Sequence, residues 1–330
     1  MQTCNEVVAP VSARASGRWI RPLTALVTSA VLLGLLLWLL DPASLRRLWS
    51  QIEWGYVVVA SILFGLNLVA RGFRLAYLAG GPAAPWIRVA ARHQIIFSIL
   101  PSGLGDAGFP VIARKLAGIG VWSATRVIIA YRAQDLCALL LLGLSGLLVH
   151  RAGGATPVAW LLILMACWIA LAWSAGLVRW LARLALFAAR RITVLERYAE
   201  PLDKMAGVSS PAALTGRLWS AGLTCLGWSL VIGAMWSIFA ALTVRLGPAE
   251  IMIILAGLNL LGVVAVFTIA GLGVSEGGLA AILLMIGFGG EEALSLAVLV
   301  RSASLVMTLL TSLIVDRIVW SLALFGQSPD

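Results

Sequence analysis

The sequence predicts an all-α protein that crosses a membrane several times, and three observations support this. Of the 330 residues, 61% are hydrophobic and only 12% are charged, whereas about 25% of the residues in a soluble domain are charged. Apolar runs close to the roughly 20 residues that a helix needs to cross a bilayer recur from Leu23 onward. Most basic residues lie between these runs, as in loops held on the cytoplasmic side.

The net charge of +10 indicates contact with anionic lipid. In a soluble protein such a charge could mean nucleic-acid binding, but between apolar segments basic cytoplasmic loops explain it more simply. We therefore expect membrane lipids as partners and no nucleic acid. The four cysteines include no C-x-x-C pair and the chain has two histidines, so we expect neither a metal nor a cofactor.

Eight hydrophobic segments are expected along the chain. Residues 1–22 are polar and basic and form a cytoplasmic N-terminus, after which 23–330 form a single transmembrane domain. The first segment is longer than the usual 7–15 residues of a signal-peptide core, which favours an uncleaved span. The segments are residues 23–40, 55–70, 88–115, 126–149, 157–177, 216–244, 251–287 and 293–314.

Two of these segments contain a glycine-rich break beside a carboxylate. The first break is LPSGLGDAGFP at 100–110, and the second is TIAGLGVSEGG at 268–278. A helical segment with an arginine follows each break, Arg132 after the first and Arg301 after the second. Glycine permits turns and close backbone approach, so both breaks are expected to interrupt helices. Their glycines and carboxylates are Gly103, Gly105, Asp106, Gly271, Gly273 and Glu276.

The distribution of charge predicts the topology. Eight full crossings would place the basic segment 176–217 opposite the basic N-terminus, against the positive-inside rule. If 88–115 and 251–287 are instead re-entrant hairpins, six crossings remain and both termini are cytoplasmic. The alternative is a full crossing by 251–268, which is long enough for one.

The hairpin model predicts an inverted repeat. Each half, 23–150 and 157–320, then has three crossings and one hairpin, and because three is odd the second half is inverted. Inverted repeats whose interrupted helices meet near the midplane are typical of transporters.

Two groups of arginines are expected to contact lipid headgroups at the surface. Arg71 and Arg74 end the second segment. Arg179 and Arg183 fall on one face of a predicted amphipathic helix within a basic cytoplasmic segment at about 178–216. A plain solvated basic loop is the alternative for this segment.

Five charged side chains are expected to form a central substrate-binding site together with the glycines of the two breaks. The charged residues are Asp106, Arg132, Asp135, Glu276 and Arg301, and the glycines are Gly103, Gly105, Gly271 and Gly273. Placing a charged side chain at the bilayer centre costs about 2.5–3.5 kcal/mol of free energy. Each of these residues is therefore expected to have an ion-pair partner or a functional role. The arginines could hold a phosphate or another anion through their planar fork, and the carboxylates could meet a cationic headgroup or carry a proton. Structural ion pairs, Asp106 with Arg132, Glu276 with Arg301 or Asp135 with Arg132, are the alternative.

Other polar groups add to this prediction. Asn67, Gln94 and Asn259 lie at similar depth in the hydrophobic segments. The chain lacks G-x-S-x-G and P-loop motifs, and His93, which has no nucleophile at readable spacing, is expected at the interface. We therefore expect no enzyme and no catalytic residue.

Short motifs in a fixed order give the chain a family resemblance. They are ARGFRLAYLAG (70–80), LPSGLGDAGFP (100–110), YRAQD (131–135), AGLGVSEGG (270–278) and the later Arg301. With these motifs the chain resembles the flippase-like membrane proteins, also described as the lysylphosphatidylglycerol synthase transmembrane region. It departs from that pattern in lacking a proline at the second break and an arginine soon after Asp106.

The resemblance implies a lipid function in a bacterial inner membrane. It implies that a phospholipid or lipid-linked headgroup passes through a midplane site between the hairpins. The alternative is a non-transporting partner of an enzyme of envelope-lipid or hopanoid synthesis. Members that make aminoacylated lipid carry a soluble transferase domain, and since these 330 residues contain none we do not expect a synthase. The substrate and the oligomeric state stay open.

Overall fold

A computed structural model describes most of the hydrophobic part of the chain. It covers residues 49–100, 102–153, 158–171, 214–264 and 273–325, apart from 161 and 164, and also residues 46, 156 and 271. The expected N-terminus at 1–22, the first span at 23–40, and Arg179 and Arg183 lie outside the described residues.

Within these ranges the chain is helical and contains no strand, which confirms the all-α prediction. A short apolar helix over Val158–Leu171 follows α6. The other helices are α3 (Trp54–Ala79), α4 (Ala83–Ile99), α5 (Ser102–Ala117), α6 (Val121–Arg151), α9 (Leu214–Ala241), α10 (Pro248–Val264), α11 (Val274–Ile286) and α12 (Gly290–Phe325).

Four helices are long and apolar enough to cross a membrane: α3, α6, α9 and α12, each with at least 26 residues. Since about 20 residues suffice, the chain is a multi-pass integral membrane protein. One boundary differs from the prediction, because α3 continues past Ala70 to Ala79. Arg71 and Arg74 therefore lie within a helix rather than after its end.

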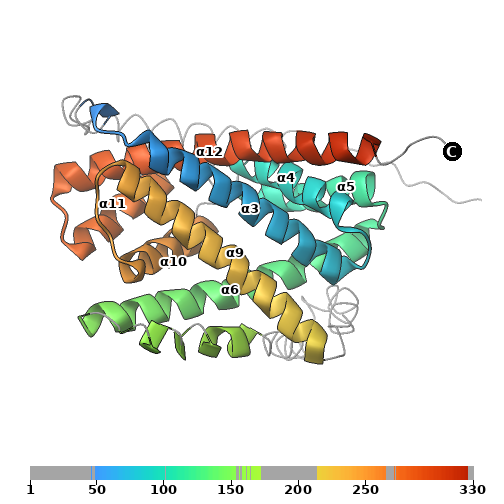
Figure 1. The fold of residues 1–330 in the computed structure, drawn as a ribbon, viewed down its shortest axis with the longest axis horizontal. Helices are drawn as coiled ribbons and strands as arrows, with labels where there is room; N and C mark the ends of the chain where they lie inside the picture. The colour runs from blue at the N-terminus through green and yellow to red at the C-terminus, as the bar shows by residue number, and fades with distance from the viewer. Residues whose placement is uncertain are drawn as a thin grey trace, which may run out of the picture.

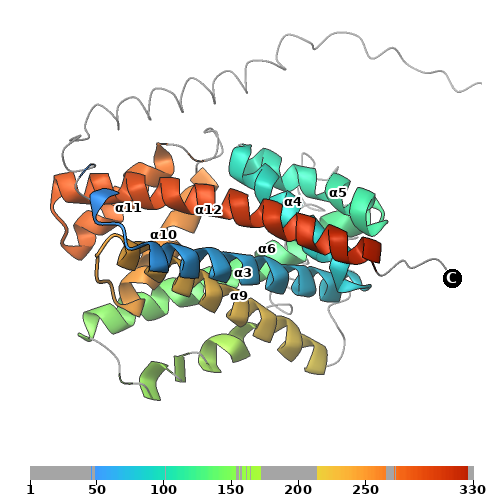
Figure 2. The ribbon, with the colours of Figure 1, turned by 45° about the horizontal axis from the view of Figure 1, so that its top comes forward.

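The four long helices set the shape of the molecule. In Figure 1, α3 and α9 run side by side through the middle, with α12 along one edge and α6 on the other side, where the short helix over Val158–Leu171 lies beyond it. Figure 2, turned by 45°, shows α12 lying across α4 and α11. The long helices thus hold two pairs of shorter helices, α4–α5 and α10–α11, each packed side by side.

The first break is shorter than predicted and lies earlier. Helix α4 ends at Ile99 and α5 begins at Ser102, so Gly103, Gly105 and Asp106 are helical. The expectation that these three residues interrupt the helix is therefore wrong. The break falls at Leu100, whose backbone is extended (φ −87°, ψ 158°), because a following proline disfavours the helical conformation.

In the second break, Gly271 and Gly273 lie between α10 and α11, whereas Gly277 and Gly278 are within α11. Gly271 and Gly273 have φ values of 71° and 84°, a region that residues with a Cβ seldom adopt. Helix α10 ends at Val264, and α11 begins at Val274, directly after Gly273. The predicted role of glycine is confirmed at this break.

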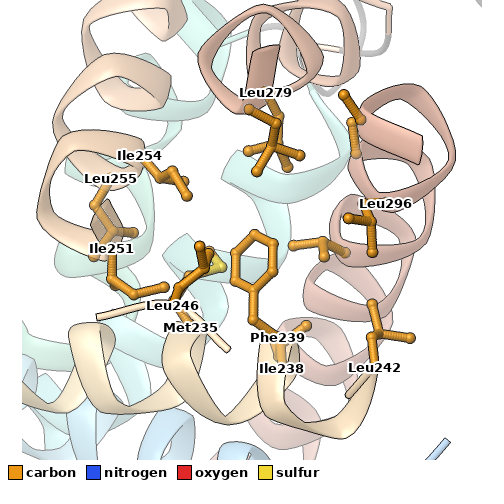
Figure 3. Close-up of a cluster of buried hydrophobic side chains, with 14 of the residues drawn as sticks. Met235, Ile238, Phe239, Leu242, Leu246, Ile251, Ile254, Leu255, Leu279 and Leu296 are labelled. Atoms are coloured by element: carbon orange, nitrogen blue, oxygen red, sulfur yellow. The ribbon is translucent and has the colours of Figure 1, made fainter. Parts of the chain in front are cut away.

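Each helix pair has its own apolar core. The second pair packs into a cluster with α9 and α12, in which Phe239, Leu279, Leu283 and Leu296 are fully buried (Figure 3). The first pair packs with α3 and α6 around Trp86 and Phe109, whose rings lie 6.5 Å apart. The two pairs are therefore anchored in separate parts of the molecule.

Candidate functional site

A polar cavity of about 210 Å³ lies among the helices. Helices α3, α4, α6, α9, α10 and α12 all contribute to its wall. Charged and amide groups are concentrated there, although the helices themselves are mostly apolar. These residues are Asn67, Arg71, Arg74, Gln94, Arg132, Asp135 and Asn259.

Helical spacing explains how these side chains meet. Asn67, Arg71 and Arg74 follow one another at intervals of four and three residues, which places them on one face of α3. Arg132 and Asp135 share a face of α6 in the same way. Asn67, Gln94 and Asn259, which were singled out from the sequence as polar groups at similar depth, all line the cavity.

Arg74 and Asp135 form a buried ion pair at the wall of the cavity. The Nη1 atom of Arg74 lies 2.6 Å from Oδ1 of Asp135. Its Nε donates to Gln134 Oε1 at 3.1 Å, and its Nη2 donates to the Tyr131 carbonyl at 2.8 Å. The Tyr131 ring centre is 4.1 Å from the guanidinium carbon, a cation–π distance.

This pair corrects two expectations. Arg74 is only 3% exposed, so the expectation that it contacts headgroups at the surface is wrong. Asp135 pairs with Arg74, not with Arg132. The physical reason lies in the packing of α3 against α6, which brings Arg74 within reach of Asp135 across 61 positions of sequence.

Arg132 is held by the carboxylate of the first helix pair. Its Nη2 lies 2.6 Å from Oδ1 of Asp106, and its Nε donates to Oδ2 at 3.0 Å. Such fork-to-fork contact fixes the orientation of a guanidinium. Arg132 also lies over the Phe97 ring, 4.7 Å from its centre. Of the three ion pairs considered from sequence, Asp106 with Arg132 is present.

His93 contacts the Asp106 carboxylate of this ion pair. Its Nε2 lies 3.1 Å from Oδ1 of Asp106, and its ring meets Phe109 edge-on at 5.2 Å. His93 is buried, so its expected place at the interface is wrong. Asp106 reaches the cavity through Arg132, while His93 holds Asp106 from within the α4–α5 pair.

Arg71 has a different environment from the other two arginines of the cavity. Its Nη1 donates to Oε1 of Gln94, a neutral acceptor, and Gln94 Nε2 in turn donates to Ser98 Oγ at 3.4 Å. The Nε of Arg71 is buried and has no hydrogen-bond partner among the described residues. No carboxylate within the described ranges pairs with it.

The charges of the second break lie elsewhere. The Glu276 carboxylate accepts a hydrogen bond of 2.6 Å from the Gly273 N–H at the start of α11, and Glu276 is 3% exposed. Arg301 interacts electrostatically with Glu276, and its Nη2 lies 3.9 Å from where a Cβ on Gly271 would stand. Neither Glu276 nor Arg301 is among the described residues that line the cavity.

Only part of the predicted site therefore forms one cluster. Arg132 and Asp135 line the cavity and Asp106 pairs with Arg132, whereas Glu276 and Arg301 form a second group with Gly271 and Gly273. Sequence reasoning missed the parts played by Arg74, Tyr131 and Gln134. The spacing of Arg74 from Asn67 and Arg71 was the available signal. Across the described ranges no three His, Cys, Asp or Glu side chains are placed to hold a metal.

The fold and the cavity define a multi-pass helical membrane protein with a buried, arginine-rich polar site. Residues 23–312 match the family model described as the Lysylphosphatidylglycerol synthase TM region, and the chain belongs to that family. The match confirms the resemblance seen in the motifs and fits a role connected with membrane lipid. No curated protein and no solved structure matches the chain.

Proposed function

We propose that this protein binds the anionic headgroup of a phospholipid or lipid-linked molecule in the arginine-lined cavity and moves it across the bacterial inner membrane. One observation carries the proposal: three guanidinium groups, from Arg71, Arg74 and Arg132, meet at a cavity enclosed by apolar helices. Charges inside a membrane protein are costly and mark the paths of polar ligands. We propose translocation without chemical change, and hence no enzymatic activity.

The chemistry of the cavity suits a phosphate group. Guanidinium presents several N–H donors in a plane, which matches two phosphate oxygens at once. A volume of about 210 Å³ is smaller than the roughly 300–1,000 Å³ of pockets for drug-sized ligands. It can hold a headgroup while the acyl chains stay among lipid.

In the proposed arrangement α4–α5 and α10–α11 are re-entrant hairpins that enter from opposite sides, between six crossings of an inverted repeat. Two observations support this topology. The four helices have 13 to 17 residues each, fewer than the roughly 20 that span a bilayer. With these hairpins the basic segments and both termini also lie on the cytoplasmic side, as the positive-inside rule requires.

Cysteine labelling tests this topology. Lys204→Cys and Glu291→Cys would be made singly in a background without the native cysteines and labelled with an impermeant maleimide. We expect labelling from opposite sides, with position 204 inside. Labelling of both positions from one side contradicts the inverted arrangement.

A proteoliposome assay tests translocation itself. Purified protein is reconstituted with NBD-labelled phosphatidylglycerol, and dithionite bleaches the outer leaflet. We expect wild-type protein to expose the inner probe faster than protein-free vesicles do, and Arg132→Gln to remove most of that difference. Arg126→Gln is the matched control, because Arg126 lies on the same helix, is exposed, donates a hydrogen bond to Ser123 and is not among the described residues that line the cavity. Equal rates with and without wild-type protein contradict transport.

A second candidate function is that of a non-transporting partner of a lipid-synthesising enzyme. The family description favours it, because it names a region of a synthase. The same cavity would then present a bound headgroup to the enzyme. Co-purification with such an enzyme, headgroup binding and no lipid transfer would together favour this function.

A further inference from the structure

The three arginines of the cavity differ in how their charges are compensated. Arg74 has Asp135 at 2.6 Å, and Arg132 has Asp106 at 2.6 Å. Within the described part of the chain, Arg71 has only the neutral Gln94 amide as a hydrogen-bond acceptor. Among the described charges of this site, three cations and two carboxylates leave one positive charge, and it belongs to Arg71.

The surroundings of Arg71 leave room for one further partner. Arg71 lines the cavity, and its buried Nε donates to no described residue. The amide of Gln94 is itself oriented by Ser98, so the Nη1 side of the guanidinium is occupied. The Arg71 side chain is half-buried, and its guanidinium carbon lies 5.5 Å from the centre of the Tyr131 ring. A neutral ring supplies no countercharge, and a charge held partly out of water is stabilised by one. An anion beside Arg71 would supply both the acceptor and the countercharge.

We propose that Arg71 is the anion receptor of the cavity and that the site selects ligands with a single negative charge, a phosphodiester in preference to a phosphomonoester dianion or a diphosphate. This inference deepens the proposed function and rests on it for the lipid nature of the ligand. It separates phospholipids with a diester headgroup from lipid carriers that end in a phosphomonoester or diphosphate.

The preference follows from electrostatics at short range. A first negative charge neutralises Arg71. A second would have no cation left, because Arg74 and Arg132 are already paired, and it would lie near the carboxylates of Asp135 and Asp106. Charge repulsion is strong in surroundings of low dielectric constant, and unfavourable contacts of this kind exclude wrong ligands.

The test measures binding of two NBD-labelled lipids to the full chain in nanodiscs. At about pH 8 phosphatidylglycerol carries one charge and phosphatidic acid approaches two. We expect the diester to bind at least about tenfold more tightly there, and the difference to shrink near pH 5, where the monoester carries one charge.

Two variants assign the preference to Arg71. Arg71→Gln removes the free charge. Gln94→Glu keeps the shape of the side chain and gives Arg71 a carboxylate, so that the net charge of the site becomes zero. Each should weaken phosphatidylglycerol binding at least about tenfold, while Arg126→Gln leaves it unchanged. If Arg71→Gln fails to fold, the isosteric Gln94→Glu variant still tests the assignment.

Free dimethyl phosphate distinguishes the source of the anion. Displacement of the lipid by dimethyl phosphate supports recognition of the phosphodiester alone. Failure to displace it supports a site that needs the lipid as well.

Equal or tighter binding of the dianion at about pH 8, or full affinity in Gln94→Glu, overturns the inference. Single-charge binding without transfer would refute only translocation, and transfer unaffected by both variants would refute only the role of Arg71.

Discussion

The two short helix pairs resemble each other in sequence but differ in how they are held together. In α4–α5, Asp106 reaches out of its own helix to bind Arg132 on α6 and His93 on α4. In α10–α11, Glu276 binds the backbone N–H of Gly273, three residues away. The first carboxylate pairs with a cavity arginine on another helix, whereas the second caps its own helix and interacts electrostatically with Arg301 on α12.

The two helix pairs also differ in how closely their backbones approach each other. A Cβ at Gly105 would lie 2.8 Å from the backbone Cα of Phe97, but a Cβ at Gly278 would meet the end of the Leu261 side chain. At Gly105 the two helices of the first pair meet backbone to backbone, which leaves no room to adjust. At Gly278 the neighbour is a side chain, Leu261, which can change its conformation. The comparison teaches that a repeated motif need not repeat its chemistry. The first pair supplies the carboxylate that orients a cavity arginine, whereas the second pair contributes Asn259 to the cavity wall.

The largest effect is expected from adding a methyl group at Gly105, where α5 lies against the backbone of α4. Gly105→Ala should reduce the free energy of unfolding by about 2 kcal/mol, because α4 and α5 must move apart. Gly278→Ala should cost less than about 1 kcal/mol, since Leu261 can change rotamer. SDS-dependent unfolding measures both values. Gly108→Ala is the control on α5, because its Cβ would meet Ile96 at an ordinary 3.5 Å. Equal costs for Gly105→Ala and Gly278→Ala would remove the distinction in packing.

The second-largest effect is expected on lipid transfer when Asp106 loses its charge. Asp106→Asn keeps the shape of the side chain but removes the charge that orients Arg132. We expect lipid transfer in the proteoliposome assay to fall at least about tenfold, equivalent to roughly 1.4 kcal/mol. Unchanged transfer by folded Asp106→Asn protein would show that the ion pair is only structural.

A smaller effect is expected where the first pair meets α12. Arg88 and Arg92 both contact Asp316, each through Nε at 3.1 Å. These side chains are partly exposed, so Asp316→Asn should cost about 0.5 kcal/mol of stability. The difference from wild type should diminish at high salt, because ions screen exposed pairs. A loss that does not depend on salt would contradict an electrostatic origin.

The smallest effect is expected from Glu276→Gln, the same chemical change at the second carboxylate. Glutamine can still accept the Gly273 hydrogen bond, as it does in capping boxes. We therefore expect transfer within about twofold of wild type, equivalent to roughly 0.4 kcal/mol. A loss as large as that in Asp106→Asn would place the second break on the lipid path.

The sequence predicted the helical membrane fold because the apolar length of each segment by itself decides whether that segment can span a bilayer. It predicted the approximate positions of both breaks, because proline and glycine act on their own backbone and its neighbours. It misplaced Gly103, Gly105 and Asp106 because a glycine within a helix can serve packing as well as turning. For Gly105 that packing partner is Phe97, and it is not apparent from local sequence.

By itself, the sequence determined the class of the protein, its family and the positively charged residues available for a site. Only the tertiary structure decided which charges are compensated. Arg74 and Asp135 meet across 61 positions, and Arg132 and Asp106 across 26, because packed helices bring distant residues together. Ion pairing depends on distances of a few ångströms, which no spacing along the chain specifies. That selection of partners leaves Arg71 as the one cavity arginine without a carboxylate among the described residues.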